Sequence, residues 1–320
     1  MIDFCRMAGE NTTEWEIYIE ERNDIMMNNS KKNTIRVCLL GLGRTGKEVA
    51  GALLDQEDVQ LVAAFVRPGS EKCGQDVGTL IGRGEVGMAV QGIDQLDAFL
   101  SANEVDVAVD FSRPEATLHS ANILARRQVG MVVCTTGFND IQMQKLKTIG
   151  ERSGSGLVYA PNITLGVNVL MLLSNLAASI LESYDCTIVD SHFKGKADAP
   201  SGTAKKLATQ IQQSRAELKK GREQAEVITE SIRAGGIIGK HDVMIAGEYD
   251  MIEIKHESFS RKAFATGALR AVRFINGRKG YHEMQEVLDM QRVMENYLRR
   301  HVADSSLRTP ADPATASYPS

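Results

Sequence analysis

The chain has 320 residues, of which 43% are hydrophobic and 24% are charged. This balance is typical of a folded globular protein and excludes wholesale disorder, and the length predicts two domains because one core seldom exceeds roughly 250 residues. A formal net charge of −4 leaves no basic surface for a nucleic acid or an anionic membrane, so we expect neither as a partner.

The cysteines and the apolar stretches limit the cellular compartment. The five cysteines stand singly, without the close pairs of a zinc site or the density of a disulfide scaffold, and the histidine spacing predicts no metal. The most apolar stretch, residues 165–181, is interrupted by Asn168 and Ser174, so we interpret it as a buried helix. No apolar run near the start suits a secretory signal. We therefore expect a cytoplasmic protein without a metal.

Strands and helices alternate through the first half of the chain. Residues 1–33 are polar without a clear repeat, and we interpret them as an N-terminal extension. From residue 34 onward the pattern predicts strands at 35–40, 59–66, 105–111, 131–135 and 157–160, and helices after Gly43 and at 96–101, 114–127 and 140–152. Such alternation is typical of a Rossmann-type, doubly wound parallel sheet. We assign residues 34–161 to a dinucleotide-binding domain.

The pattern changes after Pro161. A long helix, a strand at 186–192 and a helix from Ala204 precede a strand-rich stretch at 227–256. Within that stretch Gly247 separates two alternating runs, which predicts two antiparallel strands joined by a tight turn. This part is therefore expected to be a second α+β domain with a mixed or antiparallel sheet.

The end of the chain has no sheet of its own in this interpretation. A helical pattern at 281–298 is expected to pack back onto the first domain, so residues 276–301 complete that domain and residues 162–275 form the second. Residues 302–320 are rich in Ala, Ser, Pro and Asp, and we expect this tail to be disordered.

A glycine-rich motif lies between the first predicted strand and the first predicted helix. It reads Gly41, Leu42, Gly43, Arg44, Thr45, Gly46. In this position the glycines let the backbone approach a pyrophosphate, and the helix amino terminus favours its negative charge. The alternative is a glycine-rich turn without a ligand. The strand, the helix and the following βαβ pattern favour dinucleotide binding.

The end of the second predicted strand bears on the choice between NADPH and NADH. Proteins that prefer NAD usually have a carboxylate there, to accept hydrogen bonds from the ribose. This chain has Val66 followed by Arg67, and an arginine without a carboxylate favours a 2′-phosphate. We therefore expect NADPH as the preferred cofactor, with Arg44 as a second cation and NADH as the alternative. Arg67 could instead be an ordinary surface arginine.

The densest group of reactive side chains lies at residues 192–203, between a predicted strand and helix. His192 and Lys196 can transfer protons, and Lys196 also supplies positive charge. Ser201 and Thr203 offer hydroxyl groups beside Gly202, and the free amides of the following helix can bind a carboxylate. The same residues would also serve as a helix cap and a surface charge. The combination favours a small dicarboxylate as substrate.

In this order the motifs resemble the 4-hydroxy-tetrahydrodipicolinate reductase (dihydrodipicolinate reductase) family. The resemblance extends from about residue 35 to about residue 298. It rests on the residues at 41–46, 110–112, 135–138, 160–162, 166–168, 196–203, 231–235 and 260–261.

The resemblance implies a cytoplasmic two-domain oxidoreductase of the diaminopimelate route to lysine. Hydride would pass from NAD(P)H to the dehydrated cyclic product of 4-hydroxy-tetrahydrodipicolinate, giving tetrahydrodipicolinate. It implies a homotetramer assembled through the sheet of the second domain. It also implies His192 and Lys196 as catalytic residues, Ser201, Gly202 and Thr203 as a carboxylate cradle, and a cofactor side that includes Phe111, Ser112, Cys134, Thr136 and Ala160.

Three positions depart from the family pattern. Phe193 stands where a second histidine is common, Cys134 where a glycine is common, and Val66 where an acidic residue is usual. Phe193 leaves open a divergent member that reduces another imine or amino acid, as a diamino acid dehydrogenase does. A non-catalytic NADP-binding regulator is a further alternative, which the presence of Lys196 and the cradle disfavours.

Overall fold

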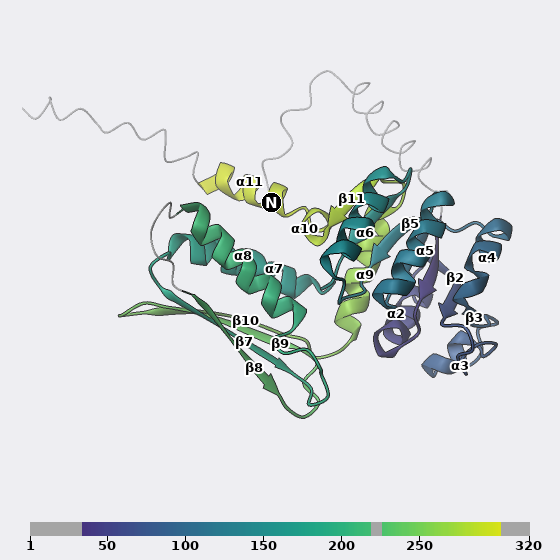
Figure 1. Cartoon of the computed structure of the whole chain (residues 1–320), viewed down its shortest axis with the longest axis horizontal. Helices are drawn as coiled ribbons and strands as arrows, with labels where there is room; N and C mark the ends of the chain where they lie inside the picture. Colours follow the sequence, from purple (N-terminus) through teal and green to yellow (C-terminus); the bar gives the residue numbers. More distant parts are fainter. Residues whose placement is uncertain (1–33, 219–225, 302–320) are drawn as a thin grey trace, which may run out of the picture.

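The computed structural model describes residues 34–218 and 226–301 (Figure 1). The extension assigned to residues 1–33 and the tail assigned to residues 302–320 lie outside the described residues. The described chain contains a seven-stranded sheet and a four-stranded sheet, each with its own helices. Figure 1 shows the smaller sheet with α7 and α8 on the left and the larger sheet with its helices on the right. The predicted fold class is confirmed.

The larger sheet is parallel throughout and has the order β11-β6-β5-β4-β1-β2-β3. Its strands are β1 (Ile35–Leu40), β2 (Val59–Val66), β3 (Gln91–Gly92), β4 (Val107–Asp110), β5 (Gly130–Val133), β6 (Gly156–Tyr159) and β11 (Gly280–Glu283). From β1 the chain continues to β2 and β3 on one side of the sheet, and from β4 it continues to β5 and β6 on the other side, so the strand order reverses between β1 and β4. In such sheets ligands bind outside the carboxyl ends of the strands at this switch point.

Alternate residues of the buried strands face two helical layers. On β1, Val37 and Leu39 belong to one apolar core, and Cys38 and Leu40 belong to the other. The first core is covered by α2 (Arg44–Leu54), α3 (Val77–Ile81), α9 (Lys262–Ile275) and α10 (Met284–Val287). The second is covered by α4 (Leu96–Ala102), α5 (Pro114–Arg126) and α6 (Asp140–Arg152). Burial on both faces explains why the strand sequences are almost continuously apolar.

The smaller sheet is mixed, with the order β10-β9-β7-β8. Its strands are β7 (Asp185–His192), β8 (Val227–Arg233), β9 (Lys240–Ala246) and β10 (Met251–Glu257). Strand β7 pairs in parallel with β8 and antiparallel with β9, and the turn at Gly247 joins β9 to β10 as predicted. Helices α7 (Leu165–Ile180) and α8 (Gly202–Leu218) cover one face, where they bury Cys186 and Ile188 of β7.

The carboxyl-terminal part of the chain differs from the sequence expectation. The helical pattern at 281–298 begins as strand β11, which pairs in parallel with β6 and is followed by α10 and α11 (Met290–His301). Helix α9 packs on the larger sheet, whereas the boundary predicted at residue 275 assigns it to the second domain. Two short elements, α3 and β3, were not predicted. None of the described helices is both long enough and apolar enough to span a membrane.

Candidate active site

A cavity of about 1660 Å³ lies at the carboxyl ends of the parallel strands and extends to the loop that follows β7. Both domains line it. Of the residues predicted for cofactor and substrate, those that line the cavity are Arg44, Thr45, Phe111, Ser112, Cys134, Thr136, Ala160, His192, Lys196, Ser201, Gly202 and Thr203. Gly41, Gly43, Gly46 and Arg67 do not line it. The structure therefore brings all the predicted catalytic and substrate residues and most of the predicted cofactor residues to one cavity.

The glycine-rich turn before α2 is fixed by contacts within the chain. Gly41 has φ of +95°, and a Cβ atom there would lie 2.6 Å from the carbonyl oxygen of Phe111. A Cβ atom at Gly46 would likewise meet the backbone of Gly41. At Gly43 a Cβ atom would meet nothing within 4 Å, so this glycine leaves space open. Helix α2 starts after Gly43 with no side-chain cap and no acidic residue in its first turn, which suits a phosphate.

A buried carboxyl group lies directly behind the cavity-lining residues Phe111 and Ser112. Asp110 ends β4 and accepts hydrogen bonds from the amide of Ser112 (2.7 Å) and the hydroxyl of Thr135 (3.2 Å). Burial raises the pKa of the Asp110 carboxyl, although these hydrogen bonds oppose the shift. Burial also raises the pKa of the adjacent Cys134 thiol well above its usual value, with a smaller contribution from Asp110. Cys134 is therefore a buried neutral thiol in the wall, without the activation of a nucleophile.

The predicted substrate residues lie around the amino terminus of α8. The Ser201 hydroxyl accepts a hydrogen bond from the amide of Ala204 (3.2 Å), so this residue does cap the helix. Thr203 Oγ1 accepts a hydrogen bond from Asn162 Nδ2 (2.7 Å), which ties α8 to the segment that leaves β6. A Cβ atom on Gly202 would meet nothing within 4 Å, so the first helical turn has open space in front of it. The capping function and an anion-binding function are thus compatible here.

The two candidate proton donors have acidic neighbours. Lys196 Nζ lies 2.6 Å from Asp198 Oδ1, and His192 Nδ1 lies 3.0 Å from Asp190 Oδ1 without hydrogen-bond geometry. Burial would raise the pKa of the Asp198 carboxyl, but the contact with Lys196 holds it below its usual range. Both donors line the cavity, and His192 is the more buried of the two.

Sequence reasoning missed Asp190, the buried carboxylate beside His192. Asp190 is fully buried and accepts hydrogen bonds from the Ser201 amide (2.9 Å), the Ser201 hydroxyl (2.7 Å) and Arg233 Nη2 (2.8 Å). His241 Nε2 lies 3.3 Å from the same carboxyl group. Burial alone would raise the pKa of Asp190. The contacts with His192, His241, Arg233 and Ser201 outweigh burial and hold that pKa far below its usual range.

Asp190, His192 and His241 also bring three potential metal-ligand atoms to within 4.8 Å of one another. Both oxygens of the carboxylate already accept hydrogen bonds, and one of the donors is the cationic guanidinium of Arg233. A metal ion at this place would lie beside that positive charge. The geometry favours an internal charge network.

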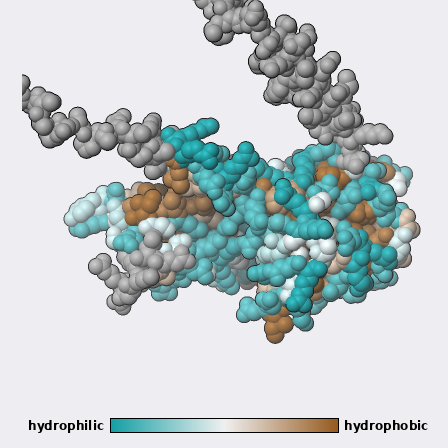
Figure 2. Space-filling model, turned by 90° about the horizontal axis from the view of Figure 1, so that it is seen from above, coloured by the Kyte–Doolittle hydropathy of each residue, from teal (hydrophilic) through white to brown (hydrophobic). Residues whose placement is uncertain are grey.

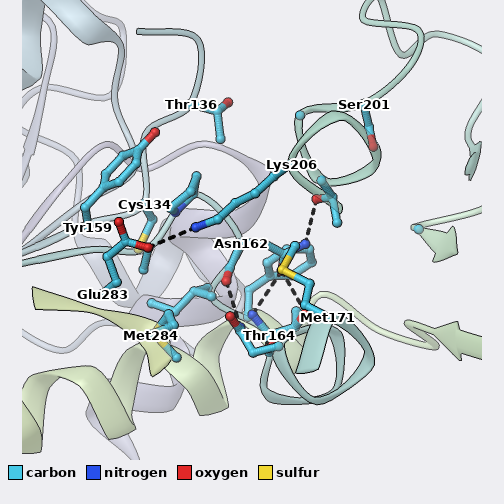
Figure 3. A pocket seen from close by; sticks show the side chains of 18 of the residues that line it. Cys134, Thr136, Tyr159, Asn162, Thr164, Met171, Ser201, Lys206, Glu283 and Met284 are labelled. Carbon is cyan, nitrogen blue, oxygen red and sulfur yellow. Dashed lines mark hydrogen bonds and ion pairs between the residues drawn. The ribbon is translucent and has the colours of Figure 1, made fainter. Parts of the chain in front are cut away.

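Further contacts join the two domains across the cavity. The guanidinium carbon of Arg44 lies 4.9 Å from the ring centroid of Phe193, a cation–π distance. Lys206 Nζ lies 3.0 Å from Glu283 Oε2, and Figure 3 shows this side chain reaching across from α8 beside Tyr159. Burial, with a contribution from Glu283, raises the pKa of Tyr159 to about 12. The start of α2 and the loop that precedes α8 are thus in direct contact.

Two family models together match most of the chain, from residue 35 to residue 288. The model described as Dihydrodipicolinate reductase, N-terminus, matches residues 35–163, and the model described as Dihydrodipicolinate reductase, C-terminus, matches residues 166–288. Together they cover the cavity-lining loops of both domains.

Similar proteins carry the corresponding name. A 4-hydroxy-tetrahydrodipicolinate reductase from Methanothermobacter thermautotrophicus is 37% identical over 273 residues, which cover 81% of this chain and 98% of the relative. One from Ralstonia pickettii is 38% identical over 261 residues, which cover 78% and 97%. A solved structure described as dipicolinate-bound dihydrodipicolinate reductase from Paenisporosarcina sp. TG-14 has a TM-score of 0.62 at 25% identity and covers 78% of this chain and 97% of that chain.

Proposed function

The chain belongs to the dihydrodipicolinate reductase family, and we propose that His192, Lys196 and the amino terminus of α8 perform this reaction in its cavity. The enzyme is an NAD(P)H-dependent oxidoreductase of lysine and diaminopimelate biosynthesis. It reduces the dehydrated cyclic product of 4-hydroxy-tetrahydrodipicolinate to tetrahydrodipicolinate. The observation that carries the assignment of roles is that Lys196 and the uncovered first turn of α8 line the same cavity as Arg44 and Thr45 of the glycine-rich motif.

The residues of the larger sheet fit a dinucleotide. The open space at Gly43 and the free amides at the start of α2 would accept the pyrophosphate. Phe111, Ser112, Cys134, Thr136 and Ala160 would form the wall on the nicotinamide side. The bound nicotinamide supplies the hydride.

The residues of the substrate loop supply the remaining needs of the reaction. Reduction of a ring double bond adds a hydride to one atom and a proton to the other. Lys196 would donate that proton, and His192 would orient the substrate beside it. The amides of Gly202 and Thr203 at the start of α8 would hold one carboxylate of the substrate. A dicarboxylate thus meets positive charge and free amides at one end of the cavity.

The first experiment compares two neighbouring lysines. Lys196→Ala should lower kcat for the dicarboxylate by about a hundredfold or more, as expected for loss of a positioned acid, and should leave NADPH binding intact. Lys194→Ala is the matched control, because Lys194 is exposed and does not line the cavity. Turnover would be followed as NADPH oxidation, and cofactor affinity by fluorescence titration. Near-normal turnover of Lys196→Ala would contradict the assignment.

NADPH is proposed as the preferred cofactor on the basis of Arg67, which is exposed directly after β2. Arg67→Ala should weaken NADPH binding more than NADH binding, because only NADPH carries the 2′-phosphate. Arg152→Ala, at the exposed end of α6, is the control. Equal losses for both cofactors would remove Arg67 from the phosphate site.

A homotetramer in the cytoplasm is proposed with this function. The face of the smaller sheet opposite α7 and α8 exposes Ile228 and Ile232 on strand β8, which suits assembly through that sheet. Light scattering of the purified chain tests the assembly. A lone monomer at micromolar concentration would contradict it, and Ile232→Lys should weaken the tetramer if the sheet forms the interface.

A further inference from the structure

The loop between β7 and α8 is hydrogen-bonded to a buried ion pair, formed by Asp190 and Arg233, that takes no direct part in the proposed chemistry. The row of β7 residues that faces α7 and α8 begins with the apolar Cys186 and Ile188 and continues with Asp190 and His192. Asp190 is fully buried, and the side chain of its partner Arg233 is only 15% exposed. Charges at these depths persist only when they are paired and hydrogen-bonded.

The ion pair holds the loop at two points. Asp190 accepts from both the amide and the hydroxyl of Ser201, where the loop enters α8. Arg233 donates to the carbonyl oxygen of Asp198 through Nη2 (2.6 Å) and to that of Asp190 through Nη1 (2.9 Å). Asp198 is also the residue that contacts Lys196. The pair therefore contacts the loop at Ser201, a residue of the predicted carboxylate cradle, and at Asp198, two residues from Lys196.

We propose that Asp190 and Arg233 are positioning residues that fix residues 193–201, so that Lys196 and the start of α8 face the substrate. This inference rests on the proposed function for its kinetic consequences. Asp190 also sets the places of His192 and His241, whose rings pack edge to face with centroids 5.3 Å apart. The Asp190–Arg233 ion pair, which lies in the smaller domain, would thereby fix the geometry of the cavity-lining loop.

The kinetic test uses Asp190→Asn, which keeps the shape of the side chain and removes its charge. We expect kcat/KM for the dicarboxylate to fall about a hundredfold, the loss that a displacement of about 1 Å can cause, with NADPH affinity unchanged within about twofold. Asp185→Asn is the matched control, since Asp185 is exposed at the other end of the same strand. A residue of general structural importance would instead weaken cofactor binding as well.

A double-variant cycle tests whether the two residues act as a unit. Arg233→Met should lower kcat/KM to a similar extent, and the double variant should be no worse than the worse single variant, because the second change removes a partner that is already lost. Additive losses would show that the two residues act separately and would overturn the proposal. So would a kcat/KM within about twofold of wild type in Asp190→Asn.

Hydrogen exchange measured by mass spectrometry gives a readout that is independent of turnover. The Ser201 amide should exchange slowly in the wild type, and a peptide covering the 193–201 loop should exchange at least tenfold faster in Asp190→Asn. Peptides from β1 and β4 should be unchanged. Arg233→Lys, which keeps the charge but loses the two-pronged hydrogen bonding, serves if Asp190→Asn fails to fold. Unchanged loop exchange would overturn this inference, whereas a wild type inactive on the dicarboxylate would overturn only the proposed function.

Discussion

Gly267 in α9 provides a sharp test of the packing between that helix and the segment that leaves β6. Gly267 is buried, and a Cβ atom there would lie 2.8 Å from the carbonyl carbon of Ile163 and closer still to its oxygen. Carbon atoms normally pack at about 3.5–4.0 Å. Because the obstacle is backbone, no side-chain rotation can relieve the contact. Ile163 is fully buried itself and directly follows Asn162, which donates a hydrogen bond to Thr203 of the proposed carboxylate cradle.

The expected magnitude follows from two opposing effects. Replacement of a mid-helix glycine by alanine stabilises a helix by about 1 kcal/mol, and overpacking of a tight core costs about 1–3 kcal/mol. With a backbone contact we expect the upper end of that cost. Gly267→Ala should therefore lower the free energy of unfolding by about 1–2 kcal/mol. It should also weaken the substrate cradle, because the displaced Ile163 adjoins Asn162.

Gly51→Ala is the matched control for this measurement. Gly51 lies within α2, and its Cβ atom would meet only the side chain of Arg83, at 3.7 Å. This variant should show only the stabilisation that alanine gives to a helix, so its free energy of unfolding should rise by about 0.5–1 kcal/mol. Urea denaturation followed by circular dichroism would compare the two variants with the wild type. If Gly267→Ala were as stable as Gly51→Ala, the inferred tight contact between α9 and Ile163 would be refuted.

Other contacts give further expectations. Because burial raises the pKa of Asp110, its ionisation opposes folding above that pKa, so Asp110→Asn should raise the free energy of unfolding at pH 7. That gain should disappear below about pH 4, where the carboxyl is protonated in both states, and denaturation at the two pH values checks it. Peptide mapping after iodoacetamide treatment of the folded protein should find Cys73, which is half-buried, labelled before the buried Cys134. Lys206→Met should lower the free energy of unfolding by at most about 1 kcal/mol, since its ion pair with Glu283 is partly exposed.

The parts of the fold predicted best from the sequence are those with strong local signals. The helix predicted at 140–152 matches α6, whose Asn139 and Gln142 form a capping box. The first two strands match β1 and β2 because both are buried on two faces and almost continuously apolar. Strand β11 was missed because four half-buried residues beside a helix carry no periodicity of their own.

The residues of the candidate site likewise divide into those predicted from local sequence motifs and those that only the fold brings together. The glycine motif and residues 192–203 are contiguous in the sequence, so their chemistry was visible before their positions were known. Arg233 and His241 lie on different strands from Asp190, and only the pairing of β7 with both β8 and β9 brings them together. Contacts of this kind depend on strand order and register, which the sequence of a single chain does not specify.

Asp190 itself did leave a signal in the sequence. On β7 the inward positions alternate, and after Cys186 and Ile188 the next inward position is an aspartate, where an apolar residue would be expected. A charge placed in register with a core row must find a partner or cost several kcal/mol. The structure shows that this partner is Arg233 of β8, which also holds the loop that carries Lys196. The first half of β7 thus contributes to the apolar core, and its second half supports the loop that bears the proposed proton donor.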